Sequence, residues 1–293
     1  MQATGTNPIL SRDCIAGLGT IAGAAPRKAA ASPPRFDASD LYGKNGPKAQ
    51  DIQQNSLGDC YFIAPMAAIA KQQPGRIKDM IRFDNKTDTF VVKLHGADGK
   101  VREIRVTQRE LADNIDRGGG STADNTGKDK RIWPAVIETA YAKMHDSNPR
   151  NGLDEGYRKI GNGGWPADAM QALTGSRGSE ISYSRRSGET QDQALTRLAR
   201  QVDAALGNGR PVNAWSVPEN GSRQDGLVDD HVYTVEKVTR NKDGDWVVSL
   251  RNPWHTNQGV GEGHDQANAV IEVPLARLVN TGGLHTFVVG PAR

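Results

Sequence analysis

Cysteine is scarce in this sequence. The 293 residues contain two cysteines, Cys14 and Cys60, so at most one intramolecular disulfide can form. That bond would join a low-complexity segment to a residue that the patterns below favour as a nucleophile. We therefore do not expect a fold that depends on disulfides.

Long apolar runs and a strong excess of one charge are lacking as well. The longest apolar run, from Cys60 to Ala70, contains Pro65 and is shorter than the roughly 18 residues that a membrane span requires. The 37 Lys and Arg residues against 34 Asp and Glu residues leave a net charge of +3, too small for a dedicated nucleic-acid-binding protein. We therefore expect a soluble protein with no membrane span and no nucleic-acid partner.

Residues 1–42 are poor in large apolar side chains. They are rich in Ala, Gly, Ser and Pro and show little periodicity, which predicts a disordered leader. The stretch from Cys14 to Ala25 matches the apolar core of a signal peptide only weakly, because glycines interrupt it and Asp13 offsets Arg12. Cytoplasmic localisation and export as an effector both stay open.

The rest of the chain divides into two regions of different pattern. In residues 43–176, helical spacing predicts a helix that begins at Cys60 with Asp59 as its N-cap, and further helices over 133–144 and 167–173. Alternating apolar residues in the same region predict a hairpin over 90–106. In residues 177–293, one helix around 195–206 precedes several strand-prone runs. We expect an α+β fold with a helical subdomain, 43–176, and a β-rich subdomain, 177–293.

One hairpin of the second region bears on function. The β-prone runs 231–238 and 246–250 are joined by the turn Asn241–Gly244. If the turn is centred between Lys242 and Asp243, His231 lies opposite position 254, close to Asn252. The hairpin therefore predicts that His231 and Asn252 converge at its open end.

These residues have the chemistry of a nucleophile and its base. A thiol attacks as thiolate, and the N-terminus of a helix favours the thiolate form of Cys60. His231 is the candidate general base, and the side-chain carbonyl of Asn252 can accept its other ring N–H and so fix the imidazole. Gln54, six residues before the cysteine, is a candidate hydrogen-bond donor to the oxyanion.

Five motifs in this order resemble the landmarks of the calpain-type cysteine protease core. They are Gln54-Asn-Ser-Leu-Gly-Asp-Cys-Tyr-Phe62, Trp133-Pro-Ala-Val-Ile-Glu-Thr-Ala-Tyr-Ala-Lys143, Ala172-Leu-Thr-Gly175, His231-Val-Tyr233 and Arg251-Asn-Pro-Trp254. The resemblance covers about residues 45 to 290. It implies a papain-like fold with the active site in a cleft between a helical Cys subdomain and a β-rich His/Asn subdomain, and the chain looks like stand-alone bacterial members of the family.

The resemblance assigns a role to each matching residue. It implies Cys60 as nucleophile, His231 as general base, Asn252 as orienting residue and Gln54 as oxyanion donor, with Trp254 shielding the His–Asn hydrogen bond. The chain departs from the family at three positions. Tyr61 stands where Trp is usual, and Asp230 and His255 stand where Gly is usual. These departures put substrate preference in doubt.

The same resemblance raises the question of calcium. Asp51 and Asp168 fall where acidic ligands of a calcium site that aligns the subdomains are expected, and carboxylate oxygens suit that ion. The simpler interpretation is that both are turn, cap or solvated residues. No cofactor is required for the chemistry, and calcium enters only as a candidate structural activator.

Alternative functions use the same features. A papain-fold enzyme with this triad can act on a glutamine side chain as a deamidase or acyltransferase, and a catalytically silent calpain-like fold can serve as a binding module. Arg185 and Arg186 are interpreted as a solvated charge pair, at a linker or at a substrate rim. The expected partner is a polypeptide substrate, and a secretion partner or inhibitor stays open.

Overall fold

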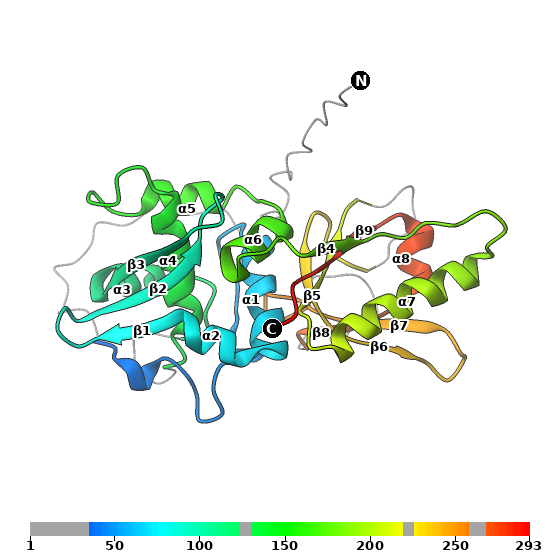
Figure 1. The fold of residues 1–293 in the computed structure, drawn as a ribbon, viewed down its shortest axis with the longest axis horizontal. Coiled ribbons are helices and arrows are strands. Elements are labelled where there is room, and N and C mark those ends of the chain that lie inside the picture. The colour runs from blue at the N-terminus through cyan, green and yellow to red at the C-terminus, as the bar shows by residue number, and fades with distance from the viewer. Residues whose placement is uncertain (1–34, 124–129, 219–225, 258–267) are drawn as a thin grey trace, which may run out of the picture.

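The computed structural model describes residues 35–123, 130–218, 226–257 and 268–293 (Figure 1). Eight α-helices and nine strands lie in these ranges, and the strands form two separate antiparallel sheets. The fold is α+β, as the sequence predicts. None of the helices in the described ranges is both long and apolar enough to cross a membrane.

The region that carries Cys60 combines helices with a small sheet. Its elements are η2 (Ala38–Asp40), η3 (Ala49–Asp51), α1 (Cys60–Gln72), α2 (Pro74–Met80), β1 (Ile81–Asp84), β2 (Thr89–His95), β3 (Val101–Thr107), α3 (Gln108–Asp116), α4 (Trp133–His145), α5 (Asp154–Ile160) and α6 (Pro166–Thr174). The sheet has the order β1-β2-β3. The predicted hairpin over 90–106 and the three predicted helices are confirmed. Gly175 ends α6 with φ 81°, a conformation that glycine adopts without strain.

The second region is built on a six-stranded sheet. Its elements are β4 (Ser179–Ile181), α7 (Gln191–Gly207), β5 (Val212–Ser216), β6 (Val232–Arg240), β7 (Trp246–Arg251), β8 (Val270–Pro274), α8 (Leu275–Thr281) and β9 (Leu284–Val289). The strand order is β4-β9-β5-β6-β7-β8. The helix predicted around 195–206 and the hairpin β6–β7 are both present.

Two hydrophobic clusters stabilise these regions. The first surrounds α1 and α4, where the rings of Phe62 and Tyr141 stack with centroids 3.8 Å apart. The second lies between the six-stranded sheet and the helices α7 and α8. Trp215 of β5 and Val232 of β6 belong to the first cluster, so the large sheet also packs against α1, which lies between the two sheets in Figure 1. The subdomain boundary at 176/177 stays a prediction.

Packed residues occur earlier in the chain than the sequence predicts. Residues 1–34, including Cys14, lie outside the described residues, but the last residues of the predicted leader are packed. Phe36 and Leu41 are 3% and 4% exposed, and the Leu41 carbonyl accepts a hydrogen bond from the Trp133 amide at 3.2 Å. The prediction of disorder up to residue 42 is therefore wrong for this part, because these two side chains reach the first cluster.

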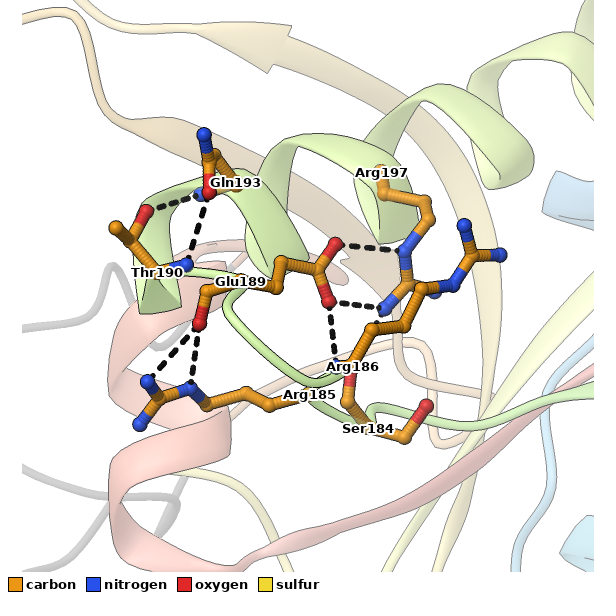
Figure 2. Close-up of polar contacts among 7 residues, drawn as sticks. All are labelled: Ser184, Arg185, Arg186, Glu189, Thr190, Gln193 and Arg197. Atoms are coloured by element: carbon orange, nitrogen blue, oxygen red, sulfur yellow. Dashed lines mark hydrogen bonds and ion pairs between the residues drawn. The ribbon is translucent and has the colours of Figure 1, made fainter.

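The loop before α7 is organised by Glu189 (Figure 2). Its carboxylate accepts two hydrogen bonds from Arg197 at 2.9 Å and one from the Arg186 amide at 2.8 Å. The Arg185 side chain donates to the Glu189 carbonyl, and Arg185 and Arg186 are both exposed, as predicted for a solvated charge pair. A capping box between Thr190 and Gln193 then starts the helix.

Candidate active site

Cys60 is the first residue of α1 and is 1% exposed. The Asp59 carbonyl accepts hydrogen bonds from the amides of Phe62 and Ile63 at 2.7 and 3.0 Å, which begins the helix. Asp59 is the N-cap residue, as predicted, although its side chain makes no capping hydrogen bond. The thiol still lies at a helix N-terminus, where the helix dipole favours the thiolate.

His231 and Asn252 meet at the open end of the β6–β7 hairpin. The distance between His231 Nε2 and Asn252 Oδ1 is 3.0 Å, and the two side chains are 0% and 1% exposed. Asn252 is itself fixed, because its Oδ1 accepts from the Trp254 amide and its Nδ2 donates to Asn257 Oδ1. An Oδ1 acceptor places the proton on Nε2. His231 Nδ1 is buried and has no hydrogen-bond partner among the described residues, so its lone pair is available.

The register that brings these residues together includes a β-bulge. Next to the turn, Arg240 pairs with Trp246, one position away from the predicted register. Glu236 is left unpaired between Val235 and Lys237, and beyond it Thr234 pairs with Arg251, as predicted. The bulge therefore compensates for the shifted turn, and Asn252 reaches the position that the sequence predicts for it.

Aromatic rings surround the imidazole. The ring centroids of Trp254 and Tyr233 lie 4.8 and 4.9 Å from that of His231, and the Tyr233 ring meets it edge-on. The neighbouring Asp230 and His255 have φ values of 49° and 65°, in the left-handed region. These are the two positions where the family usually has glycine, so the backbone conformation gives a physical reason for that preference.

The segment before Cys60 lies against the segment after Asn252. The Gln54 amide donates to the Pro253 carbonyl at 2.7 Å, and His255 Nδ1 lies 3.0 Å from the Ile52 carbonyl. The Gln54 side chain is turned inward, where its Nε2 donates to the Leu57 carbonyl at 2.6 Å and to Asp59 Oδ1 at 3.4 Å. The side-chain Nε2 of Gln54 therefore has to release the Leu57 carbonyl or Asp59 before it can donate a hydrogen bond to an oxyanion.

A pair of buried carboxyl groups supports this segment and was not identified from the sequence. Burial raises the pKa of Asp59 well above its usual value, and the neighbouring Glu138 raises it further. Glu138 also has a raised pKa because of burial, but it accepts hydrogen bonds from Asn114 Nδ2 at 2.9 Å and the Gly120 amide at 2.7 Å. The negative charge therefore resides on Glu138 and the proton on Asp59. A glutamate within the apolar α4 is the signal that could have revealed the pair.

Tyr61, which stands where the family usually has tryptophan, is buried under the glycine-rich turn. A Cβ atom on Gly164 would lie 2.5 Å from the Tyr61 ring, so this glycine allows the ring to approach the backbone. Burial raises the pKa of Tyr61 well above its ordinary value, which keeps the phenol protonated. Tyr61 is therefore a buried, protonated phenol next in sequence to the nucleophile.

The two candidate calcium ligands are engaged by protein groups. Asp51 is 1% exposed, and its oxygens accept hydrogen bonds from Trp133 Nε1 at 2.8 Å and the Lys48 amide at 2.9 Å, with Arg131 at 3.4 Å. Asp168 lies on α6 and forms an ion pair with Arg177. The described residues contain no group of three or more His, Cys, Asp or Glu side chains that could hold a metal ion. These residues therefore do not fit a calcium site built on Asp51 and Asp168.

Known proteins resemble most of the chain. Residues 32–274 match the family described as calpain family cysteine protease. The chain is 28% identical over 214 residues to the calpain-type cysteine protease DEK1 of Zea mays, covering 70% of this chain and 9% of that protein. It is 26% identical over 210 residues to calpain clp-4 of Caenorhabditis elegans, covering 70% and 27%. It is 24% identical over 238 residues to the calpain-2 catalytic subunit of Gallus gallus, covering 79% and 31%. The chain therefore spans less than a third of the length of each of these relatives.

Proposed function

The chain belongs to the calpain family of cysteine proteases, and from this premise we propose that it is an endopeptidase that hydrolyses polypeptides through Cys60, His231 and Asn252. The observation that carries the proposal is the state of His231. Its Nε2 faces Asn252 Oδ1 at 3.0 Å, and its Nδ1 is buried and has no hydrogen-bond partner among the described residues. A buried basic nitrogen that is held in one tautomer suits proton transfer to and from a thiol.

The first half of the reaction forms an acyl-enzyme. His231 Nδ1 takes the proton of the Cys60 thiol, and the sulfur attacks the carbonyl carbon of the scissile peptide bond. The carbonyl electron pair moves to oxygen, and the resulting oxyanion accepts a hydrogen bond from the Cys60 backbone N–H. When this intermediate collapses, the C–N bond breaks, and the imidazolium gives its proton to the leaving amine.

The second half regenerates the enzyme. His231 Nδ1 takes a proton from water, and the hydroxide attacks the thioester carbonyl. Collapse of the second tetrahedral intermediate releases the new carboxyl end of the substrate, and the proton returns to the sulfur. Asn252 holds the imidazole in one orientation through both halves of the reaction, because rotation of the ring would move Nδ1 away from the thiol and the leaving amine. Gln54 contributes a second oxyanion donor once its Nε2 releases Asp59.

The experiment compares the parent with three variants on a quenched fluorescent peptide and on an unfolded protein substrate. Cys60→Ala and His231→Ala should each abolish turnover with the fold retained, and Cys14→Ser is the matched control that should keep full activity. An alkylating probe should label Cys60 in the parent. Proteolysis that persists in purified Cys60→Ala contradicts the proposal. If mass spectrometry shows a mass change at glutamine without cleavage of the backbone, deamidation or acyl transfer replaces hydrolysis as the function.

A further inference from the structure

Three charged side chains connect the helix that carries Cys60 to the hairpin that carries His231 and Asn252. Glu236 lies on β6, and one of its carboxylate oxygens accepts a hydrogen bond from Arg251 Nε at 2.6 Å. The other oxygen accepts from Lys71 Nζ, near the C-terminal end of α1. The side chains of Arg251, Glu236 and Lys71 are 11%, 14% and 32% exposed, so water screens this cluster only in part.

The bulge in β6 is the reason why Glu236 can make both contacts. Glu236 is the residue without a cross-strand partner, between the pairs Val235–Leu250 and Lys237–Ser249. A bulge re-aims the side chain of its extra residue, and here the carboxylate is placed between the helix and β7. In a regular hairpin with one residue fewer, the register at Asn252 would also change. The same irregularity therefore sets the position of Asn252 and the position of Glu236.

A second contact shows that β6 lies along α1. The Thr234 hydroxyl donates to the Ala64 carbonyl at 2.8 Å, in a buried position. Ala64 and Lys71 are seven residues apart, so they lie two turns apart on one face of α1. Thr234 and Glu236 therefore contact one helix face at two levels. The nucleophile begins that helix, and the base immediately precedes that strand.

We propose that Glu236 is a positioning residue: by holding Lys71 and Arg251 together, it fixes the hairpin end that carries His231 and Asn252 relative to the helix that begins at Cys60. This inference rests on the proposed function. A change at Glu236 should leave the reacting atoms in place and alter the approach of the imidazole to the thiol. A displacement of about 1 Å at reacting groups can lower a rate by as much as 10²-fold.

The same sheet offers a matched control for this residue. Glu272 on β8 accepts from Lys237 at 2.9 Å and from Ser249 at 3.0 Å, and the side chains of Lys237 and Glu272 are 56% and 57% exposed. Glu272→Gln therefore removes a carboxylate that, like Glu236, pairs with a lysine, but from the edge strand β8, two strands from β6. Glu236→Gln makes the equivalent chemical change inside the cluster.

Two measurements test the proposal in a Cys14→Ser background. The first is hydrolysis of one fluorescent peptide, in which Glu236→Gln should lower kcat by about 10-fold or more with KM changed less than about 2-fold. The second is the rate at which iodoacetamide alkylates Cys60 as a function of pH. In Glu236→Gln the pH of half-maximal alkylation should move upward, because the thiolate loses the nearby imidazolium. Glu272→Gln should match the parent in both measurements.

A double-mutant cycle separates positioning from a general loss of stability. Lys71→Gln changes a more exposed member of the cluster, so it should fold even if Glu236→Gln does not. Like Glu236→Gln, it should lower kcat and move the pH of half-maximal alkylation upward. The double variant should be no slower than the slower single variant, since both substitutions remove one interaction. The proposal is overturned if Glu236→Gln has the same kcat and the same alkylation profile as the parent. It is also overturned if Glu272→Gln changes both as much as Glu236→Gln does. If the parent cleaves no peptide, the proposed function fails, and the alkylation profile alone decides the role of Glu236.

Discussion

The segment that leads to Cys60 and the segment that follows the hairpin lie against each other, but they are held in different ways. Residues 251–257 continue from a paired strand, so the backbone register of β6 and β7 determines their position. Residues 51–59 pair with another segment at an isolated β-bridge between Ile52 and Ser121, and they are also held by buried polar side chains, such as Asp51 against Trp133 and Asp59 against Gln54. Substitutions in the first segment should therefore affect catalysis more than stability, and substitutions in the second should affect stability more.

The largest effect that tests this difference is expected for Asn252→Ala. The substitution removes the acceptor of His231 Nε2 and leaves the hairpin paired, so kcat should fall by about 10²-fold, the lower end of what general acid–base catalysis contributes. Asn257→Ala is the control, since Asn257 contacts the far side of the Asn252 amide, and it should cost less. Steady-state kinetics on a peptide measures both. Parent activity in Asn252→Ala shows that another group orients the imidazole.

On the other segment, Asp51→Asn should lower the free energy of unfolding by about 1 to 3 kcal/mol. Trp133 Nε1 and the Lys48 amide donate to the same oxygen of Asp51, so an amide that keeps its oxygen there turns its NH2 group toward the Arg131 guanidinium. Asp168→Asn should change it by less than about 0.5 kcal/mol, since that side chain is half-exposed. Urea unfolding measures both. Activity should be the same in chelator and in millimolar calcium. Calcium-dependent activity that Asp51→Asn abolishes contradicts the structural interpretation and restores Asp51 as a ligand.

The sequence predicts the hairpin side of the site better than the cysteine side. The β-prone runs of β6 and β7 and the intervening turn are local signals, and they place His231 near Asn252 even though the bulge at Glu236 was not predicted. A bulge depends on the partner strand, so a single strand's pattern does not reveal it. The helices α1 and α4 follow from their apolar periodicity, whereas the short strands β5 and β9 acquire their identity only inside the sheet.

The packing around the buried carboxyl pair was the least predictable part. The glycine-rich segment 118–122 suggests an exposed loop tip, but a Cβ on Gly119 would lie 2.0 Å from Asn114 Oδ1 and 2.5 Å from Glu138 Oε2. These glycines allow the backbone to approach Glu138, so that the Gly120 amide can donate to it. Sequence spacing alone gives no indication that residues this far apart meet in the core.

The carboxyl groups that support the two segments, Asp59 within residues 51–59 and Glu236 through its bond to Arg251, should also differ in the sign of their pH dependence. Burial and Glu138 raise the pKa of Asp59, so Asp59 contributes stability that is present below its unfolded pKa of about 3.9 and is lost as the pH rises. For Glu236, burial alone would raise the pKa, but hydrogen bonds from Lys71 and Arg251 lower it. Glu236 therefore contributes stability that is present above its unfolded pKa of about 4.3 and is lost as the pH falls through the lower folded pKa.

Urea unfolding of Asp59→Asn and Glu236→Gln between about pH 3 and 7, a range that spans the unfolded pKa values of both carboxyl groups, checks these signs. Relative to the parent, Asp59→Asn should gain stability as the pH rises above about 4, by at most about 1.4 kcal/mol per pH unit for one group. Over the same rise Glu236→Gln should lose stability relative to the parent. Slopes of the same sign for the two variants would mean that the two segments do not hold their carboxyl groups differently.

The smallest effects are expected where the two segments touch, at the residues with left-handed backbone. Asp230→Gly removes a Cβ that costs about 1 kcal/mol at φ 49°, and glycine adds a conformational entropy cost of about 0.5 to 1 kcal/mol, so these two backbone terms should nearly cancel. Asp88→Gly, at φ 54° and away from the site, receives the same strain relief but also loses the ion pair with Arg35 and the hydrogen bond from Gln108 Nε2. His255→Gly has the same two backbone terms at φ 65° and also loses the contact between Nδ1 and the Ile52 carbonyl, so it should be less stable than the parent by about 1 kcal/mol. Urea midpoints rank the three variants. Equal stability of His255→Gly and the parent would show that the contact between the segments at Ile52 adds nothing, and that the bond between the Gln54 backbone amide and the Pro253 carbonyl is sufficient to hold them together.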